Sequence, residues 1–121
     1  MPRISDAEWT VMAVLWAQSP RTANEVVDAL AGRVKWSAAT VKTMLNRLVR
    51  KGALRFRAEG KRYLYSPAVS RDACVRSETR SLVDRLFGGA TAAMLAHFVE
   101  DGQLSRKEMD ELRGLLDRKG R

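Results

Sequence analysis

Cysteine and histidine are nearly absent from this chain, which has one of each among its 121 residues, Cys74 and His97. A single cysteine excludes a disulfide within the chain, and so few Cys and His side chains cannot complete a closed structural zinc site. These two residues also stand too far apart in the sequence to suggest a nucleophile with its base. We therefore expect no metal, no cofactor and no enzymatic activity.

Long apolar runs are missing as well. The longest run falls far below the roughly 18 residues that a membrane span requires. The first ten residues, MPRISDAEWT, include Asp6 and Glu8 and contain no apolar signal core. Together with the near absence of cysteine, this predicts a soluble, cytoplasmic protein that does not enter a membrane.

Acidic residues are scarce in the middle of the chain. Residues 33–62 hold ten Lys and Arg against one acid, Glu59, in a chain of net charge +8. Residues 70–121 are nearly neutral, with ten basic and nine acidic residues. A basic block inside folded sequence favours a polyanionic partner, most simply nucleic acid, and the alternative is a charged surface that only maintains solubility.

Capping signals and hydrophobic periodicity predict the order of the elements. Capping boxes at residues 5–8, 22–25 and 105–108 indicate three helix starts, and Ser37 caps a further helix that ends at Gly52. Residues 34–36 form a short connector that has room for one strand-like pair. At residues 54–67 the period changes to two around Glu59 and Gly60, which is typical of a β-hairpin. Four aromatic residues at core spacings are expected to be buried: Trp9, Trp16, Phe56 and Tyr65.

Three helices followed by a hairpin is the order of a winged helix-turn-helix. The expected fold is mainly α with a small β-hairpin wing, divided into a DNA-binding domain at 1–69 and a helical dimerisation region at 70–121. Helices are expected at about 70–87, 90–100 and from 105 onward, and a chain of this length cannot easily bury all their apolar sides. The residues expected to hold a homodimer together are Val75, Leu82, Val83, Leu86, Phe98, Leu112, Leu115 and Leu116.

The helix expected at 37–51 has two unlike sides. Val41, Met44, Leu45 and Leu48 cluster on one side at about 100° per residue. The other side and its flanks contain no acid, and carry Ala39, Thr40, Lys42, Thr43, Asn46, Arg47 and Arg50. A major groove about 12 Å wide accepts one helix, in which Thr and Lys can reach base edges. Four basic residues of the hairpin are expected on the DNA backbone: Arg55, Arg57, Lys61 and Arg62.

Four stretches resemble the penicillinase-repressor family: ISDAEWTVMAVLW, SAATVKTMLNRLVRKGAL, KRYLYSPAVSRD and HFVEDGQLSRKEMDELRGLL. The resemblance covers about residues 4–117 and implies a homodimeric transcriptional repressor of a double-stranded DNA operator with dyad symmetry. It identifies 37–51 as the recognition helix and implies DNA contact at Thr40, Lys42, Thr43 and Arg47. Ala38 and Ala39 stand where the family often has a Pro-Lys type pair, a departure that bears on base preference.

The resemblance also bears on how repression is relieved. Members linked to β-lactams are inactivated by a proteolytic cut at an Asn-Phe step, and the aligned step here is His97-Phe98, so a sensor protease is a candidate partner. Copper-linked members carry a C-terminal cysteine cluster, but no cysteine follows Cys74 here. Two alternatives stay open: a winged-helix regulator released by a small molecule, and a winged helix that docks only to protein.

Overall fold

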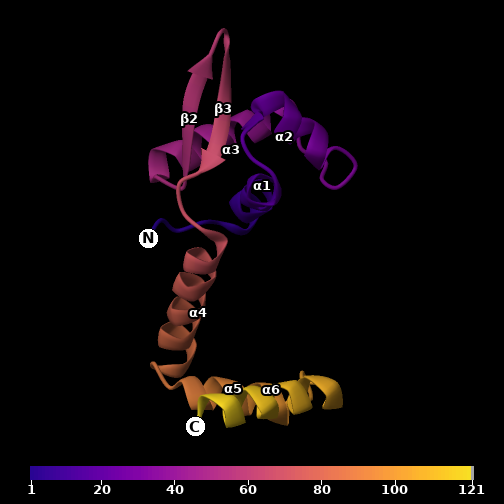
Figure 1. Cartoon of the computed structure of the whole chain (residues 1–121), viewed down its shortest axis with the longest axis vertical. Coiled ribbons are helices and arrows are strands. Elements are labelled where there is room, and N and C mark those ends of the chain that lie inside the picture. The colour runs from indigo at the N-terminus through magenta and orange to yellow at the C-terminus, as the bar shows by residue number, and fades with distance from the viewer. Residues whose placement is uncertain (121) are drawn as a thin grey trace. The chain divides into compact units, whose positions relative to one another are not determined.

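The computed structural model describes residues 1–120, and Figure 1 shows their arrangement. The class expected from the sequence, mainly α with a small β-hairpin, is confirmed. Within the described residues, the elements in chain order are α1 (Asp6–Ala17), β1 (Arg21–Thr22), α2 (Ala23–Leu30), α3 (Ala38–Lys51), β2 (Leu54–Glu59), β3 (Arg62–Pro67), α4 (Arg71–Phe87), α5 (Thr91–Glu100) and α6 (Arg106–Lys119).

The chain divides into two compact units, Met1–Ser77 and Glu78–Arg121. The division falls within α4, so this helix begins in the first unit and ends in the second. The sequence placed a boundary between roles at residues 69 and 70, just before α4 begins. That assignment of DNA binding to one part and dimerisation to the other stays a prediction.

The helices begin where the capping signals predict. At α1, the Ser5 amide donates to Glu8 Oε1 at 2.9 Å and the Glu8 amide donates to Ser5 Oγ at 3.2 Å. The same reciprocal pair of bonds begins α2 and α6. These bonds satisfy amides that the first turn of a helix leaves without partners. At the end of α3, Gly52 has φ of 84°, a left-handed conformation that glycine adopts without strain.

The core of the first unit lies among α1, α2, α3 and the base of the sheet. It is formed by apolar side chains that recur at helical spacing and are at most 8% exposed. From the three helices these are Val11, Met12, Val14, Leu15, Val26, Leu30, Val41, Met44, Leu45 and Leu48. Ile4, Ala53, Leu54, Tyr65 and Cys74 complete the core, so the start of α4 packs on the same unit.

The sheet has three strands in the order β1-β3-β2, with both pairs antiparallel. The sequence predicted β2 and β3 but missed β1, in which Arg21 pairs with Tyr65 and Thr22 with Leu64. A strand of two residues is too short to produce a period. The expected strand-like connector at 34–36 contributes only an isolated bridge between Ala31 and Val34.

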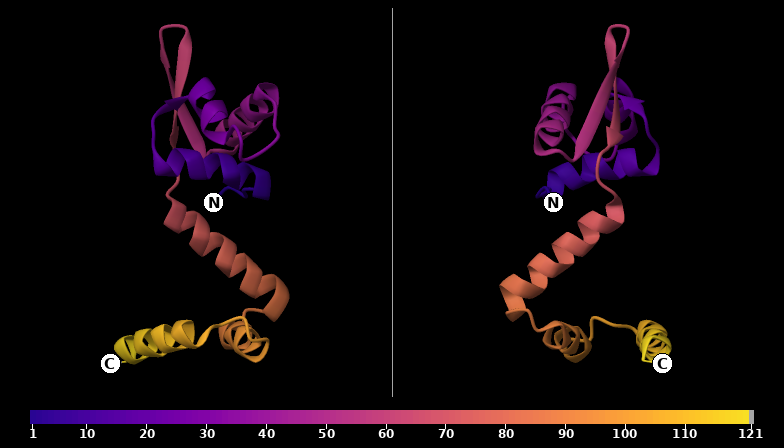
Figure 2. Two further views of the ribbon diagram at one scale, coloured as in Figure 1. Left: turned by 90° about the vertical axis from the view of Figure 1, so that its right-hand side faces the viewer. Right: turned by 60° about the vertical axis from the view of Figure 1, so that its left-hand side comes forward.

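The aromatic residues were predicted to be buried, and for one of them this is wrong. Tyr65 is 7% exposed, and Trp16 packs against the core and donates from Nε1 to the Val69 carbonyl at 3.0 Å. Trp9 meets Trp16 edge to face with ring centroids 5.1 Å apart. Phe56, however, is 49% exposed. Its ring packs against Tyr63 and Tyr65 on the hairpin itself and is open to solvent on the side of α3. The hairpin as a whole extends past the helices of this unit (Figures 1 and 2).

The second unit leaves much apolar surface exposed. Val83 and Met94 are buried at 2% and 8% exposure, so Val83 is already enclosed within its own chain. Large apolar side chains of the second unit that are at least 36% exposed are Leu86, Phe98, Val99, Leu115 and Leu116. Among residues 1–120, no single helix is both long and apolar enough to cross a membrane, although α4 and α5 would qualify together as a bent pair.

Candidate nucleic-acid interface

The outer side of α3 is exposed along its whole length. The apolar residues of α3 at positions 41, 44, 45 and 48 are at most 8% exposed and fix the helix to the body of the unit. The seven residues predicted for DNA contact are all exposed: Ala39, Thr40, Lys42, Thr43, Asn46, Arg47 and Arg50. The structure therefore brings these predicted residues together on one acid-free surface.

The hydroxyl groups on this surface are oriented by the helix itself. Thr43 Oγ1 donates to the Ala39 carbonyl at 2.9 Å. The Thr40 amide donates to Ser37 Oγ at 3.1 Å, and the two hydroxyl oxygens lie 3.0 Å apart. With its proton used in this way, Thr43 presents a methyl group and acceptor lone pairs to the outside. Such a surface suits the methyl group of thymine or an amino group on a base edge.

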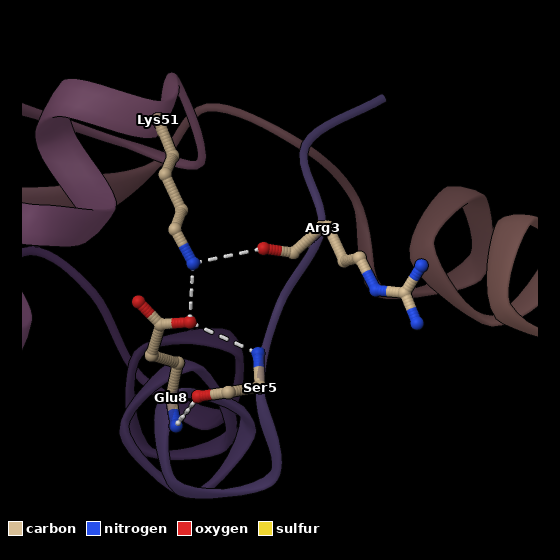
Figure 3. A network of polar contacts seen from close by, with 4 residues as sticks. All are labelled: Arg3, Ser5, Glu8 and Lys51. Carbon is tan, nitrogen blue, oxygen red and sulfur yellow. Dashed lines mark hydrogen bonds and ion pairs between the residues drawn. The ribbon is translucent and has the colours of Figure 1, made fainter.

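The C-terminal end of α3 is tied to the N-terminal end of α1 (Figure 3). Lys51 Nζ lies 2.5 Å from Glu8 Oε1 and 3.0 Å from the Arg3 carbonyl oxygen. Glu8 is 1% exposed, and its other oxygen, Oε2, is buried without a hydrogen-bond partner among residues 1–120. Sequence reasoning gave Glu8 only its capping role, because the pair joins residues 43 positions apart.

The pKa of Glu8 lies below its ordinary value of 4.5. Burial raises the pKa, but hydrogen bonds from the Lys51 ammonium and from the Ser5 amide and hydroxyl lower it by more. The carboxylate is therefore ionised at neutral pH and neutralises Lys51. One of the cations counted in the basic block is thus directed toward the protein and not toward a partner.

The wing has two faces of opposite character. In the antiparallel register, Phe56 lies opposite Tyr65 and Ala58 opposite Tyr63. Because side chains alternate along a strand, these residues share one face, which we call the aromatic face. The ring centroids of Phe56 and Tyr63 are 4.8 Å apart and those of Phe56 and Tyr65 are 6.3 Å apart. Burial raises the pKa of Tyr65, and the neighbouring Tyr63 raises it further.

The other face of the wing, the ionic face, holds three of the four basic residues predicted for backbone contact. Arg55, Arg57 and Arg62 alternate with the aromatic side chains, and Glu59 lies among them. Arg57 and Arg62 approach the Glu59 carboxylate at 3.7 Å and 3.4 Å. The fourth residue, Lys61, is exposed in the turn next to Gly60, which has φ of 64°.

A groove separates the aromatic face from α3. Its lining comes from Asn46, Val49 and Arg50 on the helix and from Phe56, Tyr63 and Tyr65 on the wing. Asn46 and Arg50 also belong to the outer side of α3, so the groove opens directly beside it. The lining contains one cation and no acid. Sequence reasoning missed this groove, because it had assigned Phe56 and Tyr65 to the core.

Cys74, His97 and Phe98, which were considered for roles other than DNA contact, lie outside the sequence that forms this surface. Cys74 is buried, and His97 Nε2 lies 3.1 Å from Asp101 Oδ2 at the C-terminal end of α5. The step His97-Phe98 lies within α5, with both side chains exposed. Within the described part of the chain, no group of three or more His, Cys, Asp and Glu is placed to hold a metal ion.

Residues 4–118 match the sequence model of the penicillinase repressor family. The chain belongs to this family. It is 38% identical to the penicillinase repressor of Bacillus licheniformis over 117 residues, which cover 97% of this chain and 91% of that protein. It is also 28% identical to the methicillin resistance regulatory protein MecI of Staphylococcus aureus strain N315, over 96% of this chain and 94% of that one. The resemblance noted from the sequence is confirmed.

Solved structures show the same fold for this family member. The B. licheniformis repressor BlaI, solved as a monomer in complex with the blaP half-operator, is 44% identical and has a TM-score of 0.53 over 59% of this chain and 87% of that one. The wild-type MarR of Escherichia coli has a TM-score of 0.54 over 95% of this chain and 76% of its own, at 19% identity. The second likeness shows a shared winged-helix architecture and nothing about chemistry.

Proposed function

We propose that this penicillinase-repressor family member is a transcriptional repressor that binds a pseudo-palindromic DNA operator as a homodimer. The observation that carries the proposal is the acid-free outer side of α3, held in place by a buried apolar side and by the Lys51–Glu8 pair. This side fits a major groove, and Lys and Arg around it neutralise phosphate. The relative solved with a half-operator is 44% identical to this chain over 59% of its length.

Dimer formation is supported by the second unit. Large apolar side chains on α5 and α6 are exposed and available for contact with a second subunit, including Phe98, Val99, Leu115 and Leu116. A two-fold dimer would present two copies of α3 to successive major grooves, about 34 Å apart. Such a protein works in the cytoplasm, where the DNA is, and we assign it no enzymatic role.

The test separates base reading from backbone contact on α3. Thr43→Ala should relax preference at one base pair of each half-site, lowering discrimination there by about tenfold, since one mismatch typically costs about 1–3 kcal/mol. Arg47→Gln should weaken binding to all duplexes alike and reduce the slope of log affinity against log salt by about one. The measurement is a mobility shift on operator and scrambled duplexes at several salt concentrations.

Comparing Thr43→Ala with Arg47→Gln can also contradict the proposal. Both side chains are exposed on the same helix, so either substitution alone should leave the melting temperature nearly unchanged. If the wild-type chain binds no duplex, or binds with no dependence on salt, DNA recognition by α3 is wrong. If the two variants lose affinity in the same pattern, the division between base and phosphate roles is wrong.

We propose further that proteolysis in the second unit can relieve repression, provided that α5 opens. The step His97-Phe98 lies inside this helix, whereas a protease acts on an opened segment. Ala96→Gly, an exposed substitution that weakens a helix by about 1 kcal/mol, should therefore increase cleavage between residues 97 and 98 several-fold. Limited proteolysis with mass spectrometry measures it, with Lys107→Gly in α6 as the control. Equal cleavage of wild type and Ala96→Gly would contradict the need for opening.

A further inference from the structure

We propose that the groove between α3 and the aromatic face of the wing receives one sugar-phosphate strand of the operator duplex. The inference rests on the proposed function and goes beyond it, because it assigns wing contact to Phe56 and Tyr63 and not to the arginines of the ionic face. The occupant is the strand that borders the major groove entered by α3. Asn46 and Arg50 lie on the outer side of α3 and also line the groove, so that strand meets both.

Three aromatic rings contact one another in succession from the core toward the tip of the wing. Tyr65 is buried at the base of the hairpin, Phe56 contacts both tyrosines, and Tyr63 stands farthest along the wing. Phe56 and Tyr63 remain 49% and 52% exposed although each packs against the other. Two adjacent exposed rings are costly to leave in water, and a flat apolar ring fits the C–H surface of a deoxyribose.

The polar groups of the groove match the phosphates of the same strand. Arg50 is exposed and takes part in none of the ion pairs found among residues 1–120. Asn46 and the Tyr63 hydroxyl supply neutral donors from opposite walls of the groove. Arg, Asn and Tyr are among the side chains that commonly donate hydrogen bonds to phosphate oxygens. No acid in the lining opposes them, so the groove has the charge that a polyanion requires.

The ionic face is less suited to this contact. Arg57 and Arg62 already share the Glu59 carboxylate, at 3.7 Å and 3.4 Å. A phosphate approaching this face would meet the negative charge of Glu59 and would compete with it for both guanidinium groups. The face therefore raises the long-range attraction to DNA, while the aromatic face determines where the backbone rests.

The experiment compares substitutions on the two faces of the wing in the full-length protein bound to its operator. Phe56→Ala should lower operator affinity by about tenfold without changing the salt slope, because an uncharged contact is lost. Tyr63→Phe should lower affinity about threefold, again with an unchanged slope. Phe56→Tyr keeps a ring and should restore binding. Hydroxyl-radical footprinting should show that Phe56→Ala exposes deoxyriboses on one strand of each half-site.

Arg57→Gln distinguishes the competing arrangement. If it reduces the salt slope by about one and abolishes the same deoxyribose protection, while Phe56→Ala binds like wild type, the ionic face carries the contact and the proposal is overturned. If Phe56→Ala weakens self-association without DNA, a second copy fills the groove and the proposal is also overturned. Normal operator binding by both Phe56→Ala and Tyr63→Phe overturns this proposal alone. A wild-type chain that binds no duplex overturns the proposed function itself.

Discussion

Lys51→Met is expected to lower the free energy of unfolding by about 2–3 kcal/mol. The substitution keeps an unbranched apolar stem but removes the ammonium that lies 2.5 Å from Glu8 Oε1. It leaves a carboxylate that is 1% exposed, with its Oε2 already lacking a partner among the described residues. Breaking a buried ion pair from one side typically costs about 3–5 kcal/mol, and the 33% exposure of the Lys51 side chain reduces this. Urea unfolding followed by circular dichroism measures the change.

Two further variants establish the cause. Replacing both partners, as in Glu8→Leu with Lys51→Met, should recover part of the loss, because two apolar side chains leave no unpaired charge although the Ser5 amide loses its acceptor. Arg57→Gln removes a cation from an ion pair whose side chains are 71% and 53% exposed, and should change the free energy of unfolding by less than about 1 kcal/mol. If Lys51→Met were as mild as Arg57→Gln, the pair would not hold α3 in place.

The same pair predicts how stability depends on pH. The pKa of Glu8 is lowered by folding, so its contribution is fully present above the unfolded value of about 4.5 and is lost as pH falls through the lower, folded value. Acid should therefore reduce the stability of the wild-type chain more steeply than that of the Glu8→Leu and Lys51→Met double variant. If the free energy of unfolding fell equally steeply with pH for both proteins below pH 4.5, the assignment of this acid sensitivity to Glu8 would be wrong.

Leu115→Asp combined with Leu116→Asp is expected to convert the protein into a monomer and to weaken binding to the full operator by about 100-fold or more. Both side chains are large, apolar and half exposed on α6, at 45% and 58%. Carboxylates at these positions would be buried without partners in a dimer. Affinity for a single half-site should change little, because the loss comes from the second, linked binding event. Sedimentation and mobility shifts on full and half operators measure the two effects.

The control must match the change in charge. Lys107→Asp alters the net charge by the same two units on the same helix, at an exposed position outside the apolar set. It should leave the protein dimeric and its operator affinity close to that of wild type. If the leucine variant stays dimeric, α6 does not form the contact between subunits. If it becomes a monomer but still binds the full operator tightly, dimerisation is not needed for recognition.

Local rules in the sequence were sufficient for the helices and for one side of the site. The capping residue Ser37 and the spacing of Val41, Leu45 and Leu48 predicted where α3 begins and which side it buries, because both signals act within a few residues. The seven outer residues of α3 followed directly. These predictions needed no knowledge of which elements pack together.

Contacts between distant segments could not be predicted in the same way. The pairing of Lys51 with Glu8 depends on how α1 and α3 meet, and the strand at residues 21–22 depends on a partner more than 40 positions away. Phe56 has the alternation of a core residue, but its ring lies in the open groove beside α3 and stays 49% exposed. The two faces of the wing were evident only once the register placed Phe56 opposite Tyr65.

The short segment before the first helix has a consequence for how the chain can be altered. Ile4 is 7% exposed within the core, and the carbonyl oxygen of Arg3 accepts a hydrogen bond from Lys51 at 3.0 Å. Removing residues 1–4, or displacing them with a bulky tag, would disturb the C-terminal end of α3, the helix proposed to read DNA. Arg3 and Ile4 therefore fix the C-terminal end of α3 to the body of the first unit.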